Sequence, residues 1–186
     1  MTSKLDREEM LGSIYANIHD ENMVKHMLAT EAIMRALARK LGEDEEQWGI
    51  TGLIHDIDTE LVEGDMSNHG KLGADIAQEL GASETMSHAI LCHNEAHGIS
   101  RETTLDKALF CADPLSGLIT AAALVRPDRL SGLSTKSVMK RFREKSFAAG
   151  VNREQVAQCR EIGLELEEFI DLGIEAMKEI ASEIEL

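Results

Sequence analysis

Seven histidines occur in this 186-residue chain, which has few aromatic residues. The most informative is the adjacent pair His55-Asp56, which follows the apolar run 52–54. Neighbouring side chains of an α-helix point about 100° apart, so this imidazole and carboxylate can converge on one point only near a helix end. Together they offer a nitrogen and an oxygen ligand, which suits a hard or borderline divalent cation. Taken alone, however, the pair fits a core histidine beside a loop-capping aspartate better than a metal site, so the other candidate ligands must decide.

Further side chains able to bind a metal stand where helices are expected to begin or end. They are His26, His69, His93 and Asp113. Asp113 directly precedes Pro114, whose ring disfavours helical geometry at the preceding residue and so predicts a helix break there. This accumulation favours a shared metal centre over isolated core residues.

The order of these residues resembles the HD-domain superfamily of metal-dependent phosphohydrolases. The resemblance covers roughly residues 22–120 and implies a helical bundle of the HD type. The matching pieces are Lys25-His26, Gly52-Leu53-Ile54-His55-Asp56-Ile57, His69-Gly70-Lys71-Leu72-Gly73-Ala74, Ile90-Leu91-Cys92-His93-Asn94-Glu95 and Ala112-Asp113-Pro114-Leu115.

The resemblance also implies a set of metal ligands. A common set would consist of His26, His55, Asp56 and Asp113, and a second set of His69 and His93, with Asp56 bridging two ions. Imidazole ligands suit Fe, Mn, Zn or Ni better than Ca, so we expect divalent transition metal ions as cofactors, two of them on this pattern. Asp58 stands where the family often has glycine, and the absence of a Gly-Tyr-Pro triplet speaks against the branch that cleaves cyclic dinucleotides.

The activity implied is hydrolysis of a phosphoester by metal-activated water, as a phosphomonoesterase or phosphodiesterase. We expect the substrate to be a small nucleotide-like or other phosphorylated metabolite. Two alternatives stay open, namely a di-iron oxygenase of the same superfamily and a non-catalytic module that senses a metal or ligand.

Candidate catalytic residues are Asp56 and Lys71, whose ammonium follows the ligand His69 by two positions and can hold a phosphate. Candidate substrate-binding residues are Lys71, His97, Lys140 and Arg141. The last two belong to a basic helix. Its charged side either faces solvent or lies over the opening of the metal site, where it would bind an anionic substrate. Asp58 and Glu95 lie close enough in sequence to support the ligands.

The composition predicts an all-α fold. Hydrophobic residues make up 43% and aromatics 3%, so the strong helix formers Leu, Ala and Met must fill much of the interior. We expect one domain over residues 1–186, with the motif-bearing core at about 22–120 and C-terminal helices at 137–186. We expect Gly42 to be the C-cap of one helix and Ser83 and Thr104 to be the N-caps of two others. We also expect a helix to resume over 115–125 after the break at Pro114.

The formal net charge of −15 makes general nucleic-acid binding unfavourable and requires a local positive centre for an anionic substrate. Three cysteines without CxxC spacing disfavour a disulfide framework and a thiolate zinc site. With no signal-peptide core and no segment judged long enough to span a membrane, we expect a cytoplasmic protein without membrane partners. The apolar positions of the C-terminal helix either complete the core or form a homodimer.

Overall fold

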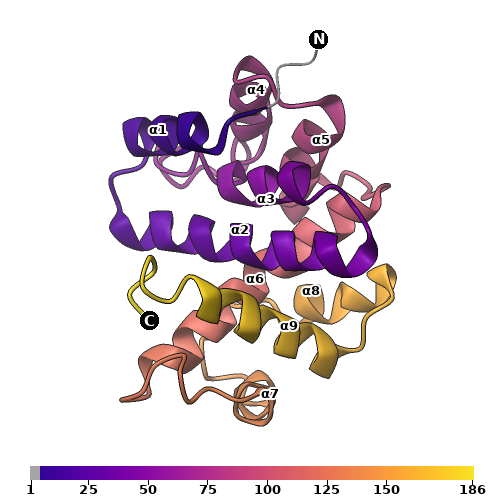
Figure 1. Ribbon diagram of the computed structural model, residues 1–186. Coiled ribbons are helices and arrows are strands. Elements are labelled where there is room, and N and C mark those ends of the chain that lie inside the picture. Colours follow the sequence, from indigo (N-terminus) through magenta and orange to yellow (C-terminus); the bar gives the residue numbers. More distant parts are fainter. Residues whose placement is uncertain (1–4) are drawn as a thin grey trace.

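The computed structural model describes residues 5–186, and within that range its regular structure is entirely helical, as the composition predicts (Figure 1). The elements are α1 (Arg7–Asn17), α2 (Glu21–Leu41), α3 (Glu45–Ile54), α4 (Lys71–Glu79), α5 (Glu84–Cys92), η1 (Glu95–His97), α6 (Thr104–Leu124), α7 (Thr135–Arg143), α8 (Arg153–Ala157), η2 (Gln158–Ile162) and α9 (Leu166–Glu179). The sequence analysis had not predicted α1.

Helix α2 crosses the middle of the molecule and organises the bundle (Figure 1). In Figure 1, α1, α3, α4 and α5 lie on one side of α2 and α7, α8 and α9 on the other. The apolar stripe that predicted α2 is buried, with Met27, Ile33 and Leu37 fully inaccessible to solvent. Gly42 ends the helix in the left-handed conformation (φ 75°), which confirms the expected C-cap.

A glycine lets α3 approach α2 closely. A Cβ atom at Gly52 would lie 2.9 Å from Cγ of Met34 and 3.0 Å from the carbonyl oxygen of Thr30. Only a residue without a side chain therefore fits this contact. The close approach places the end of α3, and with it His55, beside α2.

Helix α6 corrects the prediction of a break at Pro114. One helix runs from Thr104 to Leu124 with Pro114 inside it, and its N-cap is Thr103 rather than Thr104. Proline cannot donate the hydrogen bond that the carbonyl four residues earlier normally accepts. That carbonyl belongs to Phe110, and the side-chain amide of Gln155 donates to it across 3.4 Å. A tertiary contact therefore replaces the missing bond, and Asp113 lies within a helix rather than at its end.

Helix α6 also corrects the expectation that no segment reaches membrane-spanning length. By length and composition alone α6 is long and apolar enough to cross a bilayer. However, 61% of its apolar 18-residue stretch is buried inside the bundle. The central helix of a packed core passes the same test, so this is weak evidence for a membrane span.

The C-terminal helices complete the core on the far side of α2. Phe169, Ile170 and Ile174 of α9 are buried in the same hydrophobic cluster as α2 and α6. These apolar positions are thus accounted for within one chain, and a homodimer stays a prediction. The expected N-cap Ser83 is confirmed, since its hydroxyl accepts a hydrogen bond from the Met86 amide.

Candidate metal centre

The carboxylate of Asp56 lies at the centre of four imidazoles. Its Oδ2 is 3.4 Å from Nε2 of His26 and 3.3 Å from Nε2 of His55. Its Oδ1 is 3.4 Å from Nε2 of His69 and 3.3 Å from Nε2 of His93. The two oxygens therefore face two different pairs of histidines.

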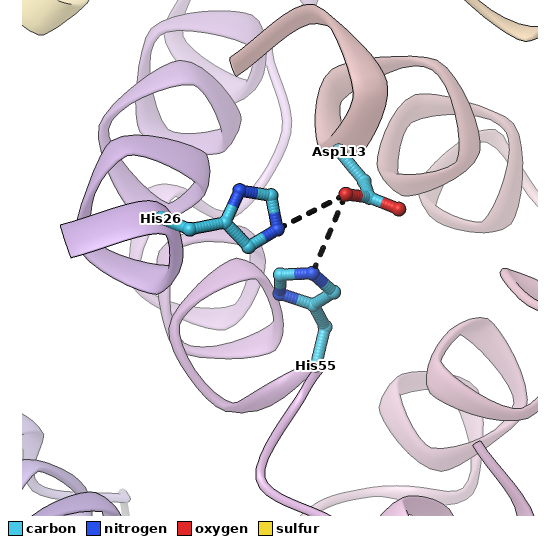
Figure 2. A group of neighbouring side chains, drawn as sticks. All are labelled: His26, His55 and Asp113. Carbon is cyan, nitrogen blue, oxygen red and sulfur yellow. Dashed lines mark ion pairs between the residues drawn. The ribbon is translucent and has the colours of Figure 1, made fainter. Parts of the chain in front are cut away.

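Asp113 of α6 joins the first pair. Its Oδ1 lies 3.1 Å from Nε2 of His26 and 3.8 Å from Nε2 of His55. Figure 2 shows the two rings, from α2 and from the end of α3, directed at this oxygen. The structure thus brings together all six side chains singled out in the sequence.

Two of the rings are oriented by the backbone at helix ends. Nδ1 of His55 lies 2.8 Å from the Gly52 carbonyl oxygen, and Nδ1 of His93 lies 2.5 Å from that of Ile90. The Gly52 carbonyl belongs to the last turn of α3 and the Ile90 carbonyl to the last turn of α5, where carbonyls lack partners within the helix. Each Nδ1 therefore donates its proton to this carbonyl, which leaves Nε2 as the free ligand atom.

A buried carboxylate orients the third ring. Oδ1 of Asp58, a fully buried residue, lies 2.9 Å from Nδ1 of His69. Its Oδ2 accepts hydrogen bonds from the backbone amides of Gly70 (2.7 Å) and Gly73 (2.8 Å). Gly70 has a φ of 85°, a conformation that favours glycine. Asp58 thus fixes both the ring and the turn that precedes α4.

A hydroxyl orients the fourth ring. Oγ of Ser116 lies 2.9 Å from Nδ1 of His26 and donates a hydrogen bond to the Asp113 carbonyl oxygen, 2.8 Å away. The sequence analysis missed Ser116. Its signal is only a serine three residues after a candidate ligand, which is too common a pattern to be informative.

The unpartnered atoms of the centre fit a metal ion. Nε2 of His55 is buried and has no hydrogen-bond partner, a costly arrangement for a polar atom unless something else satisfies it. All four rings use Nδ1 for support and present Nε2 to the centre, which is the arrangement of histidines that bind metals. The donors are imidazole nitrogens and carboxylate oxygens, so the site suits a divalent transition metal.

The charges of the centre favour ionised carboxylates. Burial alone would raise the pKa of Asp113, but a hydrogen bond from His26 and the charge of the neighbouring His55 hold it below its usual range. Burial opposes ionisation of Asp56 as well, but the neighbouring His55 and the hydrogen bonds around it lower its pKa strongly. Conversely, the two carboxylates outweigh burial and raise the pKa of His26 to about 9. Without a metal, ionised carboxylates are therefore paired with protonated imidazoles, and a bound cation would take the place of those protons.

Residues 23–118, about half of the chain, match the family described as the HD domain. The chain belongs to this family. The predicted family and fold are thereby confirmed, and the HD domain places the chain in a superfamily of metal-dependent phosphohydrolases.

Among curated proteins, the HD domain resembles several named Ribonuclease Y. The protein from Oleidesulfovibrio alaskensis is 30% identical over 110 residues, which cover 59% of this chain and 21% of the relative. The protein from Lawsonia intracellularis is 29% identical over 116 residues, or 62% of this chain and 22% of the relative. The protein from Syntrophotalea carbinolica is 28% identical over 179 residues, or 92% and 32%. The chain thus matches about a fifth to a third of the length of these relatives, and no solved structure matches it.

The second histidine pair of the HD domain is anchored by a loop that the sequence analysis did not resolve. The side-chain nitrogen Nδ2 of Asn94 donates to the carbonyl oxygens of Met66 (2.8 Å) and His69 (2.9 Å). Nε2 of His97 lies 2.6 Å from the same His69 carbonyl. In this structure His97 supports the backbone of a ligand, and its predicted contact with substrate stays a prediction.

Other predicted residues of the HD domain lie outside the cluster. Lys71 is exposed at the first turn of α4, and Glu95 faces the side chain of Asn152 at 3.3 Å. Lys140 and Arg141 line a cavity that contains none of the six clustered residues. The catalytic role of Lys71 and the substrate contacts of Lys71, Lys140 and Arg141 stay predictions.

His88 faces away from the centre, as its spacing from His93 predicts. Its Nδ1 lies 3.0 Å from Oδ2 of Asp106, which also accepts the amide of Thr103 at the start of α6. The nearby Cys92 is no candidate nucleophile, because burial raises the pKa of its thiol to about 12.

Proposed function

We propose that this HD domain hydrolyses a phosphoester with water activated at two divalent metal ions. The observation that supports two ions is the placement of the Asp56 oxygens, each of which faces a separate histidine pair. When bound, such ions supply a hydroxide nucleophile near neutral pH and polarise a phosphoryl oxygen.

The residues of the chain have distinct tasks in this proposal. His26, His55 and Asp113 would hold one ion, and His69 and His93 would hold the other. Asp56, which faces both groups, would be shared between the two sites. Two ions carry four positive charges and the two aspartates return two negative ones, which leaves a local positive centre for a phosphate on an acidic protein.

A cavity beside the centre supports a small substrate. It measures about 450 Å³ and is lined by His26, Lys25 and Arg129 among others. This volume suits a metabolite-sized ligand. Lys25 is engaged by the Glu185 carboxylate at 2.5 Å, so an incoming anion would compete with that pair. We therefore propose a nucleotide-like or other phosphorylated metabolite as the substrate.

Cleavage of RNA is the second candidate. It is favoured by the name of the relatives, Ribonuclease Y. The match to the protein from Syntrophotalea carbinolica covers 92% of this chain and so includes the segment that carries the centre. A phosphodiester makes the same demands on the metals as a monoester, so the centre itself does not distinguish the two substrates.

The test combines elemental analysis with a screen for hydrolysis. Purified protein is analysed for metal and then assayed on p-nitrophenyl phosphate, bis(p-nitrophenyl) phosphate, mononucleotides and single-stranded RNA. We expect bound metal and hydrolysis of at least one phosphoester, with both lost in Asp56→Ala. His19→Ala is the control, because it removes an exposed histidine beside Glu60 that lies in no group of side chains able to hold a metal.

Three results would contradict the proposal. Protein without metal would remove its basis. Iron with consumption of oxygen but without phosphoester hydrolysis would favour the oxygenase alternative. Metal without any turnover would favour a sensing module.

A further inference from the structure

The basic side chains of α7 differ from most others in this acidic protein. Elsewhere, Arg7, Arg35 and Lys40 form ion pairs with glutamates. In the part of the chain that the structure describes, three side chains of α7, Lys136, Lys140 and Arg143, have no ion pair or hydrogen bond, and neither has Lys145 just after the helix. Unpaired cations gathered on one element of a chain with net charge −15 call for an anionic partner.

A cavity of about 420 Å³ lies where α6 ends and α7 begins, which is within the range of small-molecule sites. Its polar lining consists of the cationic side chains of Arg126, Lys140 and Arg141, the hydroxyl of Ser137 and one carboxylate, that of Asp128. Its apolar wall includes Ala122, Val125 and Leu133. The cavity thus combines several hydrogen-bond donors with an apolar surface.

Two of these cations are held in place. Nε and Nη2 of Arg126 lie 2.9 Å and 3.0 Å from the two carboxylate oxygens of Asp128. Arg141 pairs with Glu144 at 2.7 Å. Lys140 is the cation of the cavity that no carboxylate compensates, so a ligand would add an interaction there without breaking one.

The cavity is separate from the metal centre. Ala122 follows Asp113 by nine residues, which is about 14 Å along α6 and about half a turn around it. Figure 1 likewise places α7 at the end of the molecule away from α5, whose C-cap is His93. This separation gives no support to the alternative in which the basic helix lies over the opening of the metal site.

We propose that this cavity binds the phosphate group of a phosphorylated ligand at a site of its own. Two guanidinium groups and an ammonium supply several donors, which match the oxygens of a phosphate better than the two of a carboxylate. The apolar wall would contact the part of the ligand that is not phosphate. Binding there requires neither metal nor turnover, so the proposal goes beyond the hydrolysis proposed above and can fail independently of it.

The experiment uses the full chain with the Asp56→Ala substitution in EDTA, so that the metal centre contributes nothing. Binding of inorganic pyrophosphate is measured by calorimetry and binding of a labelled single-stranded RNA hexamer by anisotropy, both at low ionic strength. Adding Lys140→Ala is expected to weaken binding about tenfold or more, and Lys140→Arg to restore most of it. Lys145→Ala is the matched control, since it removes the same charge from the same stretch but does not line the cavity.

Each outcome decides the question. Pyrophosphate binding that depends on Lys140 supports a small phosphorylated ligand. Binding of the hexamer alone with the same dependence supports phosphate recognition and identifies a nucleic acid as its source. Absence of binding by both probes, or equal losses in Lys140→Ala and Lys145→Ala, would overturn the proposal.

Discussion

The four imidazoles of the metal centre are supported by three kinds of partner. Two rings bond to backbone carbonyls, one to the Asp58 carboxylate and one to the Ser116 hydroxyl. A carbonyl cannot be removed by substitution, but the hydroxyl can be removed without changing charge and with little change of volume. Ser116 therefore offers the cleanest test of how far ring orientation determines metal affinity.

Replacing Ser116 by alanine is expected to weaken metal binding about 10- to 100-fold, because His26 loses the partner that fixes its ring and tautomer. The measurement is competition with a chelator of known affinity. Ser87→Ala is the control, since the Ser87 hydroxyl is also buried but has no hydrogen-bond partner. Equal affinities of the two variants would show that Ser116 does not position His26.

Metal affinity is also expected to depend on pH. In the metal-free protein burial lowers the pKa of His26, but Asp113 and Asp56 outweigh it and raise that pKa to about 9. Below this value the imidazolium carries a proton that a metal ion must displace from Nε2. Because the same carboxylates also hold the pKa of His55 well above its usual value, apparent affinity should rise by at least tenfold per pH unit between roughly pH 7 and 9. Calorimetry in buffers of different ionisation enthalpy would measure the released protons, and an affinity independent of pH would contradict the assignment.

The contact between α2 and α3 sets the distance between two ligands. Gly52→Ala would force a Cβ into the space occupied by Met34 and the Thr30 carbonyl, and α3 must move away from α2. We expect a loss of about 1–3 kcal/mol in the free energy of unfolding, together with weaker metal binding because His55 moves with α3. Chemical denaturation and metal titration measure the two effects.

Gly12→Ala in α1 is the control for that substitution. No heavy atom lies within 4 Å of a Cβ at this position. Alanine there should stabilise the helix by roughly 0.5–1 kcal/mol and leave metal binding unchanged. Similar losses at both positions would mean that the helix contact is not the cause.

The helices that follow local rules were predictable and those that depend on distant contacts were not. Periodicity and caps located α2, α3 and α5, because Gly42 and Ser83 act within a few residues. Pro114 misled the prediction, because the partner of the Phe110 carbonyl lies 45 residues further along the chain. The six clustered side chains were found from their types and order. Their supports, Ser116 and Asn94, were missed because common polar residues carry no local signal of such a role.

The metal centre draws on distant parts of the chain. Its ligands come from α2, the end of α3, the segment before α4, the end of α5, and α6. Ions bound only in the folded state stabilise it by about 2.7 kcal/mol at a hundredfold excess over the dissociation constant. For a chain of this size, EDTA should lower Tm by about 5–10 °C in a calorimetric scan. His19→Ala should keep this shift and Asp56→Ala should lose it. A Tm insensitive to EDTA in the unmodified protein would contradict metal binding.

The support that α8 and α9 give to α6 has a consequence for the limits of the domain. Gln155 of α8 bonds to Phe110, and a Cβ at Gly173 of α9 would lie 2.8 Å from Cδ1 of Ile119. The matched family segment ends at residue 118, before either contributor. The folding unit is therefore larger than the stretch that carries the chemistry. Transplanting residues 23–118 alone into another scaffold would leave the helix that bears Asp113 uncovered on one side, so a portable version of this centre must include α8 and α9.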